Sequence, residues 1–277
     1  MRRVDYSLQL AMANRKICIV GAGSDIAKPF LTQRNKHDSL LEVRRLNTLD
    51  LASSYEKSIA FIDMTDFDSV SKTARTILDF EPSHVINLTG FRGAAAEACS
   101  VGLEKHMVVN ALSPFLLFSI IASKTDMVQF VNFTSRSINR INEGFSGNWF
   151  FDLENKQFSI PYARSKYVLE VSSIILSQRF PAHKFTIIDP GMVKSRMTTS
   201  EAFPGYFRFI ANFFPTANLK YRALSRATFD WRFSSDSNVV KLKLFGTSLL
   251  ESKLNFDASE KRNLALCLDV ILDQSKK

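Results

Sequence analysis

The chain has 277 residues, 45% of them hydrophobic, and a formal net charge of +9. A chain of this length and hydrophobic content can bury one sizeable core, and we expect a single domain. No apolar run reaches the ~18 residues of a membrane-spanning helix. The basic residues are spread along the chain without a cluster flanked by aromatic residues, which argues against nucleic-acid binding.

Cysteine and histidine residues are few and scattered. Cys18, Cys99 and Cys267 form no CxxC motif, and the four histidines lack the spacing of metal ligands. These features predict a cytoplasmic protein without a metal site. Residues 1–14 contain no continuous apolar core, so we interpret them as a flexible N-terminal arm rather than a signal peptide.

Short apolar runs alternate with helix-length segments, a pattern typical of a parallel sheet covered by helices on both faces. We predict strands at residues 16–20, 40–44, 58–63, 84–88, 127–134, 184–189 and 241–245. We predict helices that begin near Ser24, Asp66, Val101, Tyr162, Asn218 and Ser259. The expected fold is a three-layer, doubly wound α/β fold with a mostly parallel sheet of seven strands.

The first predicted strand runs directly into the turn Gly21-Ala22-Gly23-Ser24-Asp25-Ile26-Ala27, which a helix follows. Glycines let the backbone turn tightly and approach a pyrophosphate, and the helix presents unpaired N–H groups. Asp25 and Ala27 stand where further glycines often occur, so the motif is incomplete. A simple tight turn is the alternative interpretation.

Charged residues follow the second and third predicted strands. Arg44 and Arg45 favour the 2′-phosphate of NADP, although nearby Glu42 leaves NAD open as the alternative. Asp63, followed by Met64, could bind an adenine amino group. The alternative for Asp63 is the N-cap of the next helix.

Tyr162 and Lys166 are four residues apart on a predicted helix and therefore share one face. A cation near a phenol favours the phenolate and lowers the tyrosine pKa. The pair is a candidate proton donor for a carbonyl group. Ordinary surface positions on a helix are the alternative.

These motifs, taken together and in order, resemble those of the short-chain dehydrogenase/reductase family. The resemblance covers residues 16 to about 200 and is carried by Gly21–Ala27, Asp63-Met64, Asn87-Leu88-Thr89-Gly90, Asn110, Phe133-Thr134-Ser135, Tyr162, Lys166 and Pro190-Gly191-Met192-Val193-Lys194-Ser195. Besides Asp25 and Ala27, the chain departs from the family where Leu88-Thr89 replaces the middle of the usual Asn-Asn-Ala-Gly segment. The long connection at 147–156 and the tail at 249–252 loosely resemble the retinol-dehydrogenase and protochlorophyllide-reductase branch.

The resemblance implies a Rossmann domain over residues 15–277 that binds NADP(H) in preference to NAD(H). The implied cofactor-binding residues are Gly21, Gly23, Ser24, Asp25, Ile26, Arg44, Arg45, Asp63, Met64, Asn87, Leu88, Thr89, Gly90, Tyr162, Lys166, Pro190, Gly191, Val193 and Ser195. In the implied mechanism, Ser135 polarises the substrate carbonyl, with Ser137 as a nearby alternative. Tyr162 donates the proton, Lys166 lowers its pKa and binds the nicotinamide ribose, and Asn110 holds a water molecule that links Lys166 to solvent.

The segment 203–214 is rich in aromatic residues and amphipathic. Phe203, Phe207, Ile210 and Phe214 fall near helical spacing. We interpret the region around 196–235 as a lid over a hydrophobic or medium-sized substrate. Contact with a membrane surface, aided by Arg208, and ordinary core packing are the alternatives.

The leading hypothesis is therefore an NADP-dependent oxidoreductase that acts on a carbonyl or alcohol substrate. One alternative is a nucleotide-sugar-modifying enzyme of the extended branch, which the short segment after Pro190-Gly191 disfavours. The other is a non-catalytic NADP-binding sensor or regulatory protein. The family resemblance also implies a homodimer or homotetramer through the helices that bear Asn110 and Tyr162.

Overall fold

The computed structural model describes residues 15–32, 39–44, 58–93, 96–154, 159–200, 205–229, 237–245, 248–252 and 256–274. Every structural statement below concerns these residues. The predicted arm at 1–14 lies outside them, as do parts of the predicted lid.

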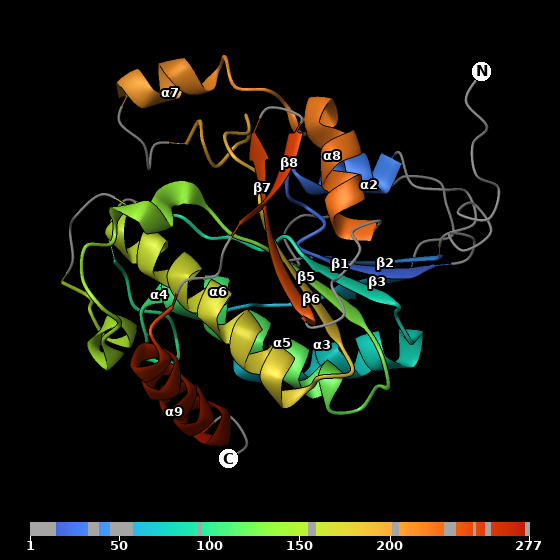
Figure 1. Ribbon diagram of the computed structural model, residues 1–277, viewed down its shortest axis with the longest axis vertical. Helices are drawn as coiled ribbons and strands as arrows, with labels where there is room; N and C mark the ends of the chain where they lie inside the picture. Colours follow the sequence, from blue (N-terminus) through green and yellow to red (C-terminus); the bar gives the residue numbers. More distant parts are fainter. Residues whose placement is uncertain are drawn as a thin grey trace.

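One sheet runs through the described residues in the strand order β3-β2-β1-β4-β5-β6-β7-β8 (Figure 1). The strands are β1 Lys16–Val20, β2 Ser39–Arg44, β3 Ser58–Phe61, β4 His84–Asn87, β5 Gln129–Phe133, β6 Lys184–Asp189, β7 Val239–Phe245 and β8 Ser248–Ser252. Strands β1 to β7 pair in parallel, which confirms the predicted seven-stranded parallel sheet. Strand β8, which we did not predict, pairs antiparallel with β7.

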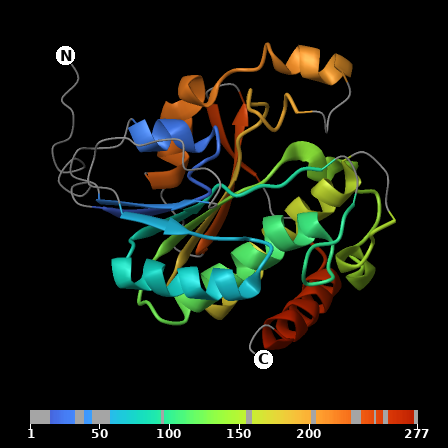
Figure 2. The same cartoon turned by 180° about the vertical axis from the view of Figure 1, so that it is seen from behind.

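Helices cover both faces of this sheet (Figures 1 and 2). They are α2 Ala27–Thr32, α3 Phe67–Phe80, α4 Lys105–Met107, α5 Ser113–Ala122, α6 Ile160–Arg179, α7 Gly205–Ala211, α8 Ala217–Phe229 and α9 Ala258–Gln274. A π-helical segment, η1 Val108–Leu112, joins α4 to α5 without a break, and two 3-10 helices lie at η2 Arg136–Arg140 and η3 Gly147–Phe150. Helices α3, α5 and α6 lie on one face, and α2 and α8 on the other.

Strand β1 shows how the sheet divides the interior into two cores. Cys18 and Val20 are buried on the face covered by α3, α5 and α6, whereas Ile17 and Ile19 are buried on the opposite face. Successive strand residues point to opposite faces, so a strand covered on both sides is apolar throughout. The uninterrupted apolar runs that predicted the strands have this cause.

Two helices begin later than the sequence predicted, and local hydrogen bonds explain both corrections. Helix α4 begins at Lys105 rather than near Val101, because the carboxylate of Glu104 accepts a hydrogen bond from Met107 N (2.9 Å) and caps it. Helix α2 begins at Ala27 rather than Ser24. Residues 24–26 form a turn, and Ala27 N donates to Ser24 Oγ (3.2 Å).

The segment Lys105–Ala122 is long and apolar enough to cross a membrane by length and composition alone. Within the folded chain, however, 83% of this segment is buried. Phe115 and Phe118 belong to its core-facing side and are almost fully enclosed. The segment therefore packs as a core helix in this structure.

Helix α9 packs against α6 and the long connection after β5. The carboxylate of Glu260 accepts hydrogen bonds from Phe145 N (2.9 Å) and from the Tyr167 hydroxyl (2.6 Å). Arg179 at the end of α6 donates two hydrogen bonds to the carboxylate of Asp269. One face of α6 is thus covered by the chain's own C-terminal helix.

Candidate functional site

A cavity of about 830 Å³ lies where β1, β4, β5 and β6 end. In open α/β sheets, ligands bind outside the carboxyl ends of the strands where the strand order reverses, here between β1 and β4. The predicted site residues that line the cavity are Gly21, Gly23, Ser24, Asp25, Ile26, Asp63, Met64, Leu88, Thr89, Gly90, Ser135, Tyr162, Lys166, Pro190, Gly191, Val193 and Ser195. The structure thus brings most of the predicted residues together.

Among the described residues, two of the predicted ones do not line this cavity, and two further predictions fall outside the described part of the chain. Asn87 and Asn110 are buried behind its wall. The side chain of Arg44 and the whole of Arg45 lie outside the described residues. The arginine argument for NADP therefore stays a prediction.

Gly21 is the glycine that the turn after β1 requires. Its φ of +82° lies in the left-handed region, and a Cβ at this position would stand 2.7 Å from Thr89 N. Any larger residue would strain the backbone and push it away from the turn that follows β4. The glycine turn and the segment Leu88–Gly90 therefore form one closely packed floor of the cavity.

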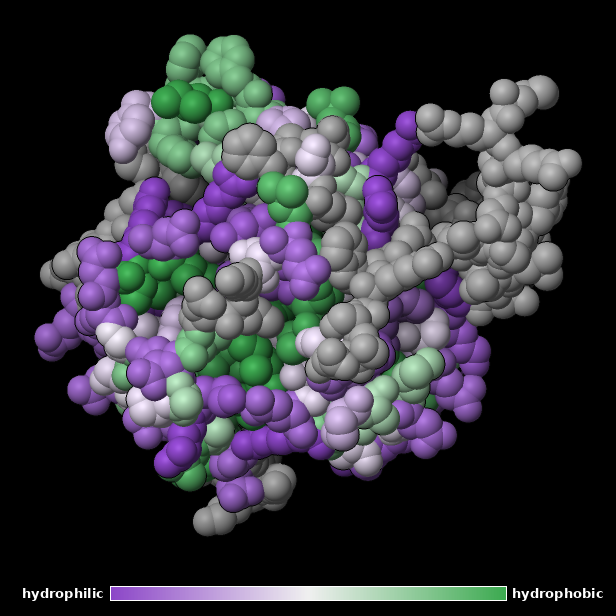
Figure 3. Space-filling view, viewed as in Figure 1, coloured by the Kyte–Doolittle hydropathy of each residue, from purple (hydrophilic) through white to green (hydrophobic). Residues whose placement is uncertain are grey.

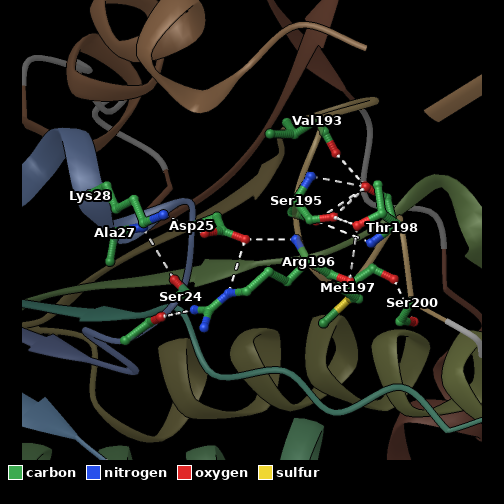
Figure 4. A network of polar contacts seen from close by, with 12 residues as sticks. Ser24, Asp25, Ala27, Lys28, Val193, Ser195, Arg196, Met197, Thr198 and Ser200 are labelled. Atoms are coloured by element: carbon green, nitrogen blue, oxygen red, sulfur yellow. Dashed lines mark hydrogen bonds and ion pairs between the residues drawn. The ribbon is translucent and has the colours of Figure 1, made fainter. Parts of the chain in front are cut away.

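Asp25, the departure from the glycine pattern, ties the glycine turn to the segment after β6 (Figure 4). Its carboxylate accepts a hydrogen bond from Arg196 N (2.6 Å) and forms an ion pair with Lys28 (2.8 Å). The Arg196 side chain also donates to Gly23 O. Burial opposes ionisation of Asp25, but these partners together hold its pKa below the ordinary value. We call this contact the Asp25–Arg196 tie.

Asn87 and Asp63 shape turns at the ends of their strands. Asn87 Oδ1 accepts hydrogen bonds from Thr89 N (3.0 Å) and from the Thr89 hydroxyl, and its amide donates to Asn132 Oδ1 (2.8 Å). Asp63 Oδ1 accepts in the same way from Thr65 N (2.9 Å). The N-cap of α3 is Asp66, so the alternative interpretation of Asp63 as the cap is wrong.

Ser135, Tyr162 and Lys166 converge at the end of β5. Tyr162 and Lys166 lie on one face of α6 and are buried, with exposed fractions of 7% and 3%. The Ser135 side chain lies close enough to Tyr162 to lower its pKa. Lys166 Nζ donates to Phe133 O (2.9 Å) and stands 5.8 Å from the centre of the Tyr162 ring.

The buried environment dominates the protonation of both groups. Burial raises the pKa of Tyr162. The charge of Arg92 and the Ser135 side chain lower this pKa, but by less than burial raises it. Burial lowers the pKa of Lys166 to about 8, against the opposing charge of Glu170. Arg92, which no sequence motif marked, is thus a cation whose charge lowers the pKa of Tyr162.

Arg92 lines the cavity beside Tyr162. Its guanidinium carbon lies 4.6 Å from the centre of the Tyr162 ring, close enough for a cation–π interaction. No local motif marks this position, because Arg92 meets Tyr162 only through the tertiary fold. Lining residues that the sequence motifs also left out include Ile62, Phe91, Lys105, Val109, Arg136, Arg140, Arg196, Met197 and Thr198.

Asn110 fixes the backbone just before Arg92. Its side-chain oxygen accepts from Phe91 N (2.7 Å), and its amide donates to Phe91 O (2.9 Å) and Ser165 Oγ (2.9 Å). Both donor hydrogens are thus used within the protein. A water relay through Asn110 stays a prediction, whereas its positioning of the Phe91 backbone is visible.

Charged side chains form hydrogen bonds with the backbone of the Pro190-Gly191 segment at the end of β6. Asp189 accepts from Gly191 N (2.9 Å) and from Arg136 Nε (3.3 Å). Lys220 of α8 donates to Pro190 O (2.7 Å). These bonds fix the backbone that forms the wall opposite the glycine turn.

Helix α7 lies in the predicted lid, with one side facing the cavity and another facing solvent. Phe207 lines the cavity, as a lid residue would. Phe209 and Phe213 are exposed by 67% and 76%, and Ile210, predicted on the same face as Phe207, is half exposed. Figure 3 shows this apolar cluster at the top of the molecule. Phe203 lies outside the described residues.

Comparisons with known proteins rest on structure alone. No protein-family profile matches the chain, and no curated protein sequence matches it. Its structure is similar to that of an uncharacterised protein from Mycobacterium paratuberculosis, with a TM-score of 0.65 and 17% identity over 95% of this chain and 94% of that chain.

Two further solved structures carry informative descriptions. A short-chain dehydrogenase/reductase from Serratia marcescens matches with a TM-score of 0.62 and 13% identity, over 85% of this chain and 98% of that one. BdcA, solved in complex with NADPH, matches with a TM-score of 0.58 and 14% identity, over 86% and 95% of the two chains. The chain therefore has the fold of the short-chain dehydrogenase/reductases.

Proposed function

We propose that this protein is a short-chain dehydrogenase/reductase that interconverts a carbonyl compound and an alcohol with NADP(H). One observation carries the proposal: Ser135, the buried Tyr162 and Lys166 line one cavity that also contains the glycine turn, and Lys166 Nζ stands 5.8 Å from the centre of the Tyr162 ring. A phenol and a serine hydroxyl in one cavity can together bind the oxygen of a carbonyl group.

The cavity fits a dinucleotide. Its volume of about 830 Å³ is in the range of ~300–1,000 Å³ for small-molecule sites. The backbone at Gly21 approaches the turn after β4 so closely that no side chain fits between them, which keeps the two turns together along the cavity. Gly21, Gly23, Ser24, Asp63 and Leu88–Gly90 would hold the cofactor, which supplies or accepts a hydride when bound.

The chain's own residues would handle the proton. Ser135 would orient the substrate oxygen, and Tyr162 would give its hydroxyl proton to that oxygen during reduction. The raised pKa of Tyr162 keeps the phenol protonated at neutral pH, as reduction requires. Lys166 would add a buried positive charge on the same helical face.

Preference for NADP over NAD is part of the proposal. Arg44 and Arg45 in the sequence support it, and a structural neighbour, BdcA, was solved with NADPH. Fluorescence titration of the protein with NADPH and with NADH tests it. Tighter binding of NADPH, lost selectively when Arg44 and Arg45 are both replaced by glutamine, is expected. Tighter binding of NADH would contradict it.

The central experiment follows NADPH oxidation with a panel of ketones and aldehydes. Tyr162→Phe removes the proton donor while keeping the ring, and we expect turnover to fall by about 10²–10⁴-fold with NADPH binding retained. NADPH binding without turnover on any carbonyl would instead favour the sensor hypothesis. The cytoplasmic location and the retinol-dehydrogenase-like branch stay proposals, as does the hydrophobic character of the substrate.

Two partner interactions also stay proposals. The exposed side chains of Phe209, in α7, and Phe213, just after it, would contact a membrane surface, and vesicle flotation of the double serine variant tests this. A homodimer or homotetramer would have to use surfaces other than the face of α6 that α9 covers. Light scattering measures the assembly.

A further inference from the structure

Two arginines stand at the Tyr162 end of the cavity. Arg92 lies against the Tyr162 ring, and Arg140, at the end of η2, lines the same cavity. Burial lowers the pKa of Arg92 to about 10, and the positive charge of Arg140 contributes to this lowering. Arg140 contacts Ser159 just before α6, and Arg92 contacts Tyr162 in the first turn of α6, so both guanidinium groups lie at the start of this helix.

Buried side chains hold Arg92 in place on both sides. Asn110 binds the preceding backbone at Phe91 N and O, and His106 Nε2 accepts a hydrogen bond from Gly93 N (2.9 Å). The other ring nitrogen of His106 contacts Glu104 (2.6 Å). Because His106 Nε2 accepts a hydrogen bond, its Nδ1 carries the hydrogen atom and donates it in a hydrogen bond to the Glu104 carboxylate. The backbone at Arg92 is thus fixed before any ligand binds.

Arg140 is also oriented by the protein. Its guanidinium donates a hydrogen bond to Ser159 Oγ, the residue before α6. Within the described residues, no carboxylate forms an ion pair with Arg140. By contrast with Arg140, Lys105 pairs with Glu97 (2.9 Å) and Arg136 with Asp189.

The acidic residues of the cavity lie at the other end. Of the described lining residues, the carboxylates are Asp25 and Asp63, which belong to the turns after β1 and β3 and have the partners given above. In addition, the hydroxyl oxygen of Ser137 is buried and has no hydrogen-bond partner among the described residues. Ser137 lines the cavity and offers a further donor.

We propose that Arg92 and Arg140 bind an oxyanion of the substrate, so that the preferred substrates are carbonyl compounds that carry a carboxylate next to an apolar body. This inference rests on the proposed oxidoreductase function. Guanidinium groups bind carboxylates through paired, charge-assisted hydrogen bonds. Phe207 and Met192, which line the same cavity, provide the apolar surface.

The kinetic test compares 4-oxo-4-phenylbutanoate with its neutral methyl ester as substrates of the NADPH-loaded protein. We expect kcat/KM to be at least about 10-fold higher for the acid, because charged hydrogen bonds are lost with the ester. Arg140→Gln should remove this preference, because kcat/KM should fall at least about 10-fold more for the acid than for the ester. Arg262→Gln, an equal loss of charge on the exposed side of α9, should preserve the preference.

A preference that is absent in the wild type, or that survives Arg140→Gln, would overturn the proposal. Ser159→Ala serves as a second variant, because it removes the hydrogen bond to Arg140 but keeps the charge. It should retain at least half of the preference for the acid. An equal loss in Ser159→Ala and Arg140→Gln would assign the effect to local structure and overturn the role of the charge.

A binding experiment separates this inference from the proposed reaction. Calorimetric titration of the protein with 4-phenylbutanoate, 4-phenylbutanamide and 3-phenylpropyl phosphate needs no turnover. The carboxylate should bind at least about 10-fold tighter than the amide, and Arg140→Gln should abolish the difference. Equal binding of acid and amide would overturn the proposal even if neutral ketones are reduced. Tighter binding of the phosphate than of the carboxylate would overturn the carboxylate assignment and make the oxyanion a phosphate.

Discussion

The two ends of the cavity are built in different ways. The cofactor end consists of short backbone turns that follow β1, β3 and β4, and each turn is recognisable in the sequence. The Tyr162 end depends on side chains from distant segments, among them Arg92 and Arg140, which meet only in the fold. Motifs thus locate a backbone cradle well and a substrate pocket poorly.

The difference also concerns charge. At the cofactor end, the carboxylate of Asp25 forms ion pairs with Lys28 and Arg196. At the Tyr162 end, Arg92 and Arg140 line the cavity beside a buried phenol whose pKa burial raises, with the carboxylate of Asp189 also contributing. The following changes test whether the two ends act separately, as this contrast predicts.

Ser135→Ala should have the largest effect and should act on turnover alone. The Ser135 hydroxyl lines the cavity with Tyr162, and its loss should lower kcat by about 10²-fold, as expected for a donor that acts in the transition state. NADPH affinity should stay within about twofold. Ser137→Ala is the matched control, and a larger loss of kcat in that variant would assign the catalytic role to Ser137.

Gly21→Ala should act on the cofactor end. The positive φ and the contact with Thr89 N should cost about 1–3 kcal/mol, seen as a lower midpoint of denaturant unfolding. The shifted turn should weaken NADPH binding by at least about 10-fold on the same energetic scale. Unchanged unfolding and affinity would contradict the close packing of the two turns.

Arg196→Gln should have a smaller effect on the same end. It removes the side-chain part of the Asp25–Arg196 tie, an exposed contact worth about 0.2–1 kcal/mol, so the NADPH dissociation rate should rise by up to about fivefold. Lys16→Gln breaks an exposed ion pair with Glu81 far from the cavity and is the control. Equal rates in Arg196→Gln and the wild type would mean that the tie does not retain the cofactor.

The pH dependence of the reaction rate should reflect ionisation at the Tyr162 end of the cavity alone. Reduction needs the protonated phenol, and because burial raises the pKa of Tyr162, the reduction rate should fall only above about pH 10. Oxidation needs the ionised phenol and should rise with pH instead. Arg92→Gln removes the charge that lowers this pKa, so the alkaline limb should move to higher pH with a neutral substrate. A shift to lower pH would contradict the assigned role of Arg92.

The sequence predicted the sheet because buried strands are apolar on both faces, as in β1 and β6. It misplaced the start of α4 because the capping residue is Glu104, a side chain that apolar periodicity does not reveal. It found Tyr162 and Lys166 through helical spacing. It could not find Arg92, because the hydrogen bonds that fix this loop come from Asn110 and His106, well over a helical turn away in sequence.

A crystal structure of the protein with NADP⁺ tests the central claim most directly. The account predicts the pyrophosphate at Gly21 and Gly23 and the nicotinamide ring beside Tyr162 and Lys166, with Arg92 and Arg140 on the substrate side of the ring. A cofactor bound outside this cavity, or a nicotinamide ring remote from Tyr162, would contradict it.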